Sequence, residues 1–77
     1  MRKPSKSILK VLAKNVRQLR HEQSISQEEL AELCGLHRTY IGAVERGERN
    51  VTLSTLEVLA AAFHLSVPEL IAPRKEQ

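Results

Sequence analysis

The segment from residue 35 to residue 50 combines side chains suited to binding a nucleic acid with two of the smallest residues. Two small residues near its middle, Gly42 and Ala43, are flanked by Arg38, Thr39, Arg46 and Arg49. Arginine binds guanine O6 and N7 through two hydrogen bonds, and a threonine methyl group contacts a thymine methyl group. Glycine inside a helix costs about 1 kcal/mol relative to alanine, so local stability does not explain Gly42. The segment is therefore a candidate DNA-reading surface, with close packing of Gly42 against another helix as the alternative.

Helical periodicity indicates the elements that position this segment. Apolar residues recur at intervals of three and four near the start of the chain, and they predict an amphipathic helix over residues 7–23. Ser26 and Glu29 have the spacing of a capping box, and the helix that they begin is expected to end at Gly35. A third helix is expected over residues 38–46, with Gly47 placed to stop it.

The second half of the chain predicts two more helices. Capping residues precede each of them: Thr52 or Ser54 for a helix through Phe63, and Ser66 with Glu69 for a short helix through Ile71. No stretch alternates as a strand does. The sequence therefore predicts an all-α, five-helix bundle in a single domain over residues 1–77. Its core covers about residues 7–71, with a basic tail at 1–6 and a C-terminal tail at 72–77.

The second and third predicted helices fit a helix-turn-helix. A short glycine turn joins them, and small and polar residues are expected on the outer face of the third. The second helix of such a motif lies in the DNA major groove, which is about 12 Å wide. Gly42 and Ala43 are expected on this exposed face, where they would allow close approach, while Arg38 and Thr39 would reach base edges from the N-terminal end of the helix.

Length and composition limit the other possibilities. A chain of 77 residues buries only ~60% of its unfolded surface, so association with a second copy would add stability. One cysteine excludes an intramolecular disulfide, and one cysteine with three histidines is too few for a structural zinc site, so we expect no metal or cofactor. No apolar stretch approaches the ~18 residues of a membrane span, and no signal peptide is recognisable. We expect a cytoplasmic protein without a membrane partner.

Basic residues are concentrated before the first acid, Glu22. Seven lysines and arginines precede it: Arg2, Lys3, Lys6, Lys10, Lys14, Arg17 and Arg20. Such a segment fits a polyanion partner or an ordinary solvated helix face. No nucleophile–base pair or metal constellation is recognisable, so an enzyme is not expected. Cys34, on the apolar side of its helix, is expected to be a buried small hydrophobe rather than a redox sensor.

The run SQEELAELCGLHRTYIGAVERGERNVTLSTLEVLAAAFHL, residues 26–65, resembles the lambda-repressor-like, Cro/repressor (XRE) helix-turn-helix family. Within that family, HRTYIGAVERGERNVTL is most similar to the controller proteins of restriction–modification systems. With the first helix included, the resemblance covers nearly the whole chain. It implies a DNA-binding domain of the lambda-repressor type.

The resemblance also implies roles for individual residues. Gln27 is expected to contact a phosphate at the positive end of its helix. The recognition helix would read bases through Arg38, Thr39 and Tyr40, although the Tyr40 ring could instead lie in the core with its hydroxyl at a phosphate. His37 is either a cap or a contact. The remaining DNA-contact candidates are Ala43 on the recognition helix and Arg46, Arg49 and Asn50 after it, with solvated loop residues as the alternative for the last three.

Two further roles are structural. The resemblance implies that Arg20 pairs with Glu45 and fixes the recognition helix against the bundle. It also implies a two-fold dimer at the C-terminal edge, where apolar residues exceed what a small core needs. The expected dimer residues are Leu65, Val67, Leu70 and Ile71.

These features together predict a transcriptional regulator that binds a pseudo-palindromic DNA operator as a homodimer. A restriction–modification controller is the function that the resemblance favours, with RNA polymerase as a further candidate partner. A general XRE repressor, or an antitoxin acting with a toxin, is the alternative within the same class. A helical protein-interaction module that does not bind DNA is the alternative from a different class.

Overall fold

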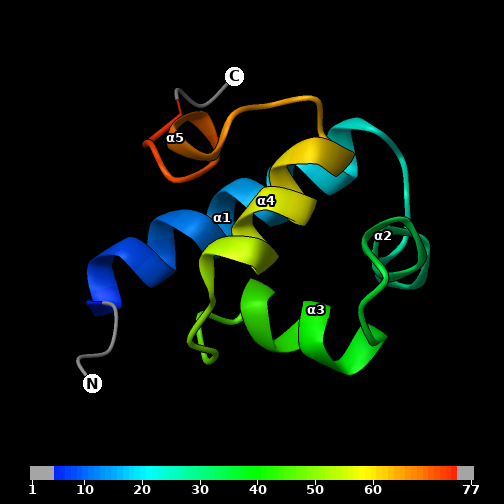
Figure 1. The fold of residues 1–77 in the computed structure, drawn as a ribbon, viewed down its shortest axis with the longest axis horizontal. Helices are drawn as coiled ribbons and strands as arrows, with labels where there is room; N and C mark the ends of the chain where they lie inside the picture. Colours follow the sequence, from blue (N-terminus) through cyan, green and yellow to red (C-terminus); the bar gives the residue numbers. More distant parts are fainter. Residues whose placement is uncertain (1–4, 75–77) are drawn as a thin grey trace.

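Five α-helices make up the part of the chain that the structure, a computed structural model, describes, which is residues 5–74 (Figure 1). They are α1 (Lys6–Glu22), α2 (Gln27–Cys34), α3 (Arg38–Glu45), α4 (Leu53–Ala62) and α5 (Val67–Leu70). No strand occurs between residues 5 and 74, and the predicted all-α fold is confirmed. Residues 1–4 of the predicted basic tail and residues 75–77 of the C-terminal tail lie outside the described residues. Lys6, assigned to the tail, is instead the first residue of α1.

Short-range capping interactions set the helix boundaries. Both predicted capping boxes are present: the Ser26 hydroxyl accepts from the Glu29 N–H, and the Ser66 hydroxyl from the Glu69 N–H. Thr52, rather than Ser54, caps α4 by accepting from the Thr55 N–H. At the end of α2, Gly35 has a φ of 68°, which is the left-handed conformation that glycine adopts without strain. The chain therefore turns sharply enough to bring α3 against α2.

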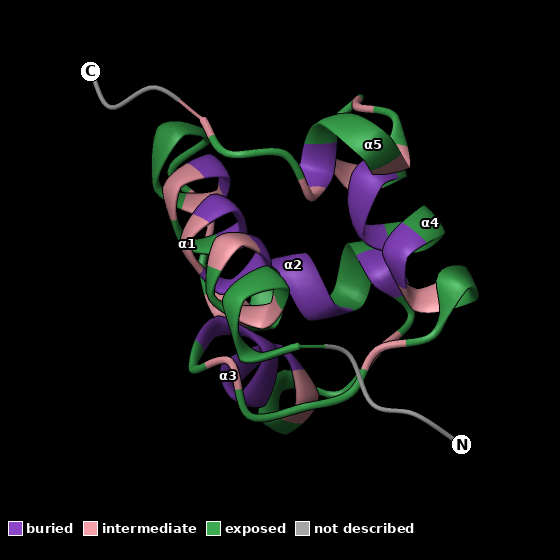
Figure 2. Ribbon diagram, turned by 90° about the vertical axis from the view of Figure 1, so that its left-hand side faces the viewer, coloured by how far each residue is buried: buried purple, intermediate pink, exposed green. Residues whose placement is uncertain are grey.

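Every helix contributes buried side chains to the hydrophobic core, and the buried faces of the helices point inward (Figure 2). The largest fully buried apolar side chains are Val16 on α1, Leu30 on α2, Ile41 and Val44 on α3, Leu59 on α4 and Leu70 on α5. α3 packs against both α1 and α2, while α4 packs against α2 and α5. α3 is thus held on two sides.

A buried asparagine, which the sequence analysis did not single out, fixes the C-terminal edge. The Asn15 side chain on α1 is 1% exposed and donates hydrogen bonds to the carbonyls of Leu70, at 2.7 Å, and Ala72, at 2.8 Å. These bonds draw α5 onto α1 and place the Leu70 side chain inside the core, with no exposed surface. The expectation that Leu70 belongs to a dimer surface is therefore wrong. The other three predicted dimer residues, Leu65, Val67 and Ile71, are partly exposed.

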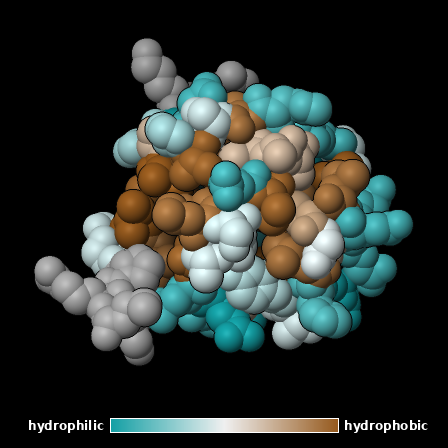
Figure 3. All heavy atoms as spheres, viewed as in Figure 1, coloured by the Kyte–Doolittle hydropathy of each residue, from teal (hydrophilic) through white to brown (hydrophobic). Residues whose placement is uncertain are grey.

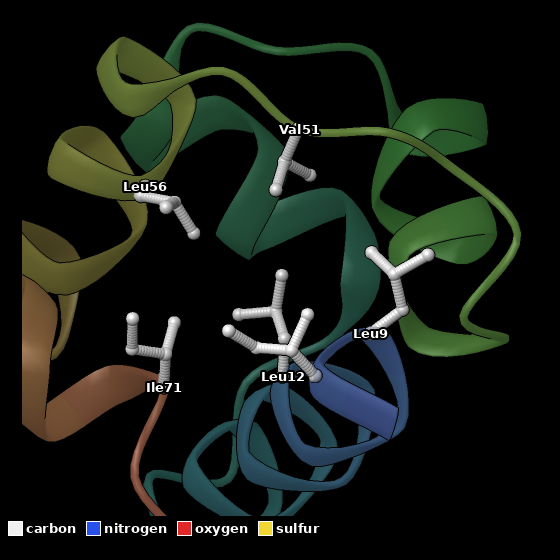
Figure 4. Close-up of a pocket in the computed structure, with 6 residues that line it drawn as sticks. Leu9, Leu12, Val51, Leu56 and Ile71 are labelled. Atoms are coloured by element: carbon white, nitrogen blue, oxygen red, sulfur yellow. The ribbon is translucent and has the colours of Figure 1, made fainter. Parts of the chain in front are cut away.

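Apolar surface remains on the face formed by α1, α4 and α5 (Figure 3). An apolar hollow opens there between the first half of α1, the start of α4 and the end of α5 (Figure 4). Its lining residues are Ile8, Leu9, Leu12, Val51, Leu56 and Ile71. Leu53 lies one helical turn before Leu56 and is 76% exposed. Leu33 on α2, at 65%, is the other strongly exposed leucine among the described residues.

Candidate nucleic-acid interface

The N-terminal end of α3 presents polar side chains to solvent. His37, Arg38 and Thr39 are exposed, and they follow directly on the turn at Gly35. His37 occupies the N-cap position but makes no side-chain capping hydrogen bond, so the capping alternative for this side chain is wrong. A guanidinium nitrogen of Arg38 lies 3.7 Å from a carboxylate oxygen of Glu28 on α2. Both side chains of this ion pair are largely exposed, and such pairs are weak, so Arg38 is available to another partner.

The middle of α3 differs from the expected bare surface. Gly42 and Ala43 are both buried. A Cβ atom added to Gly42 would lie 3.2 Å from a guanidinium nitrogen of Arg46 and 3.7 Å from the amide oxygen of Gln27. The missing side chain thus leaves space that two long side chains fill, one from the start of α2 and one from the end of α3. The expectation that Gly42 and Ala43 are exposed is therefore wrong.

An ion pair holds α3 against α1, as the resemblance implied. Arg20 donates from Nε to Oε2 of Glu45, at 2.7 Å, and from Nη2 to Oε1, at 2.9 Å. Its remaining terminal nitrogen donates to the carbonyl of Ile25, just before α2. This two-point geometry fixes orientation as well as distance. The predicted Arg20–Glu45 pair is confirmed.

Gln27 completes the same cluster. Its side-chain nitrogen donates to Oε1 of Glu45, at 3.1 Å, so the first residue of α2 is tied to the last residue of α3. Burial raises the pKa of the Glu45 carboxyl, but the hydrogen bonds from Arg20 and Gln27 outweigh it and hold that pKa below its ordinary value. The hydrogen bond to Glu45 correspondingly raises the pKa of Arg20. The carboxylate is therefore charged at neutral pH and engaged by both partners.

The segment after α3 folds back onto the recognition helix. The Arg49 guanidinium lies 5.5 Å from the centre of the Tyr40 ring, which is cation–π distance. The Tyr40 hydroxyl is 3.5 Å from the Asn50 carbonyl, a weak hydrogen bond. The ring is partly buried against the core, consistent with the alternative in which only its hydroxyl points outward. A shallow depression brings together His37, Thr39 and Tyr40, from the start of α3, and Arg49, from the segment after it.

Arg46 has a carboxylate partner that the sequence analysis missed. Its Nε donates to Oε1 of Glu48, at 3.0 Å, and both side chains are 58% exposed. The signal in the sequence was the presence of an acid two residues after the arginine. Glu28 and Glu48 thus place one negative charge beside each of two cations in the candidate interface.

The other candidate chemistry is sparse in residues 5–74. These residues contain no cluster of three or more histidine, cysteine or acidic side chains that could hold a metal ion. Cys34 is buried as predicted, and burial raises the pKa of its thiol. The helices between residues 5 and 74 are too short or too polar to cross a membrane. What the described surface offers is hydrogen-bond donors and cations around α3.

Residues 16–70 match the helix-turn-helix family, whose motif corresponds to α2, the glycine turn and α3. The chain belongs to this family. Among helix-turn-helix relatives, the control protein C.SmaI of Serratia marcescens is 62% identical over 64 residues, which are 83% of this chain and 76% of the relative. The control protein C.BamHI of Bacillus amyloliquefaciens is 44% identical over 62 residues, which are 79% of this chain and 76% of the relative.

Solved helix-turn-helix structures agree with the observed fold. The hypothetical transcription factor NHTF from Neisseria is 43% identical with a TM-score of 0.83, covering 95% of this chain and 85% of that one. The restriction–modification controller protein C.AhdI from Aeromonas hydrophila is 45% identical with a TM-score of 0.76, covering 80% of this chain and 94% of that one. The lambda-repressor-like arrangement expected from the sequence is confirmed, and the chain is a regulator of the helix-turn-helix class.

Proposed function

We propose that this helix-turn-helix regulator binds a pseudo-palindromic DNA operator as a homodimer and controls a restriction–modification system. The observation that carries the proposal is the cluster in which Arg20, Gln27 and Glu45 lock α1, α2 and α3 together. The cluster fixes the last residue of α3 to α1 and α2 and so sets the direction of the whole helix, which a helix that reads base edges from its N-terminal end requires. The similarity to control proteins supports the finer assignment.

In the proposed complex, the start of α3 enters the major groove. Arg38 and Thr39 read base edges, and His37, free of a capping role, contacts the DNA beside them. The remaining candidates contact phosphates and fix the docking angle: Gln27, Arg46, Arg49, Asn50 and the Tyr40 hydroxyl.

The proposed dimer uses the apolar face rather than Leu70. The proposed surface includes the apolar hollow, which Ile71 lines at the end of α5, and the exposed Leu53 side chain, one helical turn before Leu56 of the hollow. Leu65 and Val67, still partly exposed, are the other proposed contacts from the C-terminal edge. A second copy of the chain is a suitable occupant because a two-fold axis places two identical apolar surfaces against each other. The same axis would set two recognition helices about 34 Å apart, one turn of DNA.

The proposed regulator has no catalytic role, and it acts where bacterial DNA lies, in the cytoplasm. A contact with RNA polymerase bound to the same promoter is part of the proposal. That contact, and the sign of regulation, would be measured by transcription in vitro from a promoter that carries the operator, with and without the protein.

Selection of bound sequences from a random duplex pool tests the proposed DNA binding. We expect enrichment of an inverted repeat whose half-sites lie one helical turn apart, with two chains bound per duplex by sedimentation. Even non-specific binding is visible at low salt for a DNA-binding protein. Absence of any mobility shift at low salt would favour the protein-interaction module. Enrichment of a single half-site bound by one chain would contradict the dimer.

A further inference from the structure

A basic stripe runs along α1, outside the interface described above. Lys6, Lys10, Lys14 and Arg17 are spaced by four, four and three residues, so they lie along one face of the helix. No aspartate or glutamate precedes Glu22 in the sequence, and Lys6, Lys10 and Arg17 are exposed. We call these four residues the α1 stripe.

The α1 stripe borders the flank of α1 on which α3 and the segment after it pack, and Arg17 reaches that flank. A guanidinium nitrogen of Arg17 donates to the carbonyl of Glu45, the last residue of α3. Nearer the start of α1, the carbonyl of Leu9 and the Cβ atom of Ala13 lie 3.8 and 4.0 Å from where a Cβ on Gly47 would be. Leu9 and Ala13 each immediately precede a lysine of the stripe.

The opposite flank of α1 holds α5 and the chain after it. Asn15 donates there to the Leu70 and Ala72 carbonyls, and Glu22 pairs with Arg74 at 3.3 Å. Figure 2 shows α3 next to α1 with α5 on another side of the molecule. The α1 stripe therefore meets the end of α3 at Arg17, and it lies on a different face of α1 from Asn15 and Glu22, which hold the chain after α5.

Local helix energetics disfavour this pattern of charge. Lys6 is the first residue of α1, where the helix dipole favours an anion, and no acid lies in the first turn. The pairs Lys6–Lys10 and Lys10–Lys14 each place like charges four residues apart, which also destabilises a helix. A polyanion on this flank would relieve both effects at once. Local conflicts of this kind occur at functional sites.

We propose that the α1 stripe is a second phosphate-binding surface, which contacts the DNA backbone beyond the C-terminal end of α3. This inference rests on the proposed DNA binding. Duplex DNA is favoured over an anionic membrane because Arg17 of the α1 stripe contacts the last residue of α3, the helix that the proposed function places in the major groove. Lysines suit this role, since each acts as a point charge on a phosphate without selecting a base.

The test compares Lys10→Gln with Arg74→Gln, a variant that removes the same charge on the opposite flank. Binding would be measured on the selected operator and on a scrambled duplex across a salt series. Lys10→Gln is expected to weaken binding to both duplexes by the same factor. It should also reduce the magnitude of the log–log salt slope by ~0.9 per lost contact, or roughly 2 for a dimer. Arg74→Gln is expected to keep the parent slope, and melting curves would verify that both variants are folded.

Three results would overturn the inference. Equal slopes for Lys10→Gln and Arg74→Gln, with normal binding by the parent, would remove the α1 contact and leave the proposed function intact. An unchanged slope in Lys10→Gln together with reduced binding to phosphatidylglycerol vesicles would assign the α1 stripe to a membrane surface. Absence of parent binding to any duplex at low salt would overturn the proposed function and this inference together.

Discussion

At the scale of single residues, two arginines with the same charge occupy different surroundings. Arg38 extends from the start of α3 into solvent, with only a long, exposed ion pair to Glu28. Arg49 stacks on the Tyr40 ring after the helix has ended. An arginine that reads a base must enter the groove with the helix, whereas one held beside the helix meets the backbone. The two side chains should therefore affect binding in different ways.

Substitution of these arginines separates specificity from affinity. Arg38→Ala is expected to cost about 1–3 kcal/mol of operator binding and to relax the preference at one position of each half-site. Arg49→Ala should weaken operator and scrambled duplex alike and lower the magnitude of the salt slope by roughly 2 for a dimer. Titrations of both duplexes across a salt series measure both effects. If Arg38→Ala loses equally on both duplexes while Arg49→Ala erases the preference, the two roles are reversed.

In the proposed complex, Glu48 would compete with a DNA phosphate for Arg46. A phosphate contact by Arg46 would break its hydrogen bond to Glu48, and exposed pairs of this kind contribute about 0.2–1 kcal/mol. Glu48→Gln is therefore expected to raise DNA affinity about twofold or more, as measured by fluorescence anisotropy. Glu57→Gln, on the exposed side of α4, changes the net charge equally and is the control. In an Arg46→Ala background the Glu48 effect should vanish; its persistence there would mean general repulsion of DNA.

The side chains that surround Gly42 could not be predicted from the sequence. Its small size correctly indicated that something approaches closely, but the neighbours are Gln27, 15 residues earlier, and Arg46, one helical turn later. Which long side chain covers a glycine depends on how two helices cross. The DNA-reading interpretation treated the surface as empty because the sequence shows the gap and not what fills it.

At the scale of elements, the positions of α1, α2 and α3 depend on one carboxylate. Glu45 accepts hydrogen bonds from α1 through Arg20 and from α2 through Gln27, and it is 4% exposed. Removing one member of a buried pair leaves the other charge without compensation. The three helices should therefore lose their relative orientation when Glu45 is shortened.

Glu45→Ala is expected to lower the free energy of unfolding by about 3 kcal/mol, measured by urea denaturation. Because the folded-state pKa of Glu45 is lowered, its contribution is fully present above the unfolded pKa of about 4.3 and is lost as pH falls through the folded value. The difference between parent and variant should thus shrink below about pH 4. A difference that stayed constant down to pH 2 would show that the charge of Glu45 is not what stabilises the fold.

Helix boundaries were predictable because their causes are local. The capping boxes at Ser26 and Ser66 each involve residues three apart, so the sequence contains the whole interaction. The Arg20–Glu45 pair spans 25 residues, and it was expected only through the family resemblance. Asn15, whose partners lie more than 50 residues away, gave no signal because an asparagine in an amphipathic helix looks like a surface residue.

At the scale of the whole molecule, two surfaces are candidates for contact with a partner: the apolar face for a second copy of the chain, and the basic surface for DNA. The C-terminal apolar residues were expected to lie at a dimer interface, yet Leu70 is in the core. An excess of apolar residues at one end of the chain does not distinguish a buried side from an exposed one. Leu53, at the start of α4, is the more exposed candidate beside the apolar hollow.

Leu53→Arg is expected to give a folded monomer with much weaker operator binding. The Leu53 side chain is 76% exposed, so an arginine there should hardly change the free energy of unfolding of the single chain. In the proposed dimer the same charge would be buried without a partner, which destabilises the interface. Sedimentation equilibrium measures the mass, and Leu33→Arg, at an exposed leucine on α2, is the matched control. A dimer that survives Leu53→Arg and dissociates in Leu33→Arg would place the interface on the α2 side.

The two hydrogen bonds from Asn15 affect which sequence changes the C-terminal edge tolerates during evolution. Their two acceptors are main-chain carbonyls, which every amino acid provides. These two hydrogen bonds therefore do not depend on which side chains stand at positions 70 and 72. Drift at the exposed positions of this edge could change which subunits recognise each other while the domain keeps its shape. Two duplicated copies in one cell could in this way become separate, non-mixing regulators through a few surface changes.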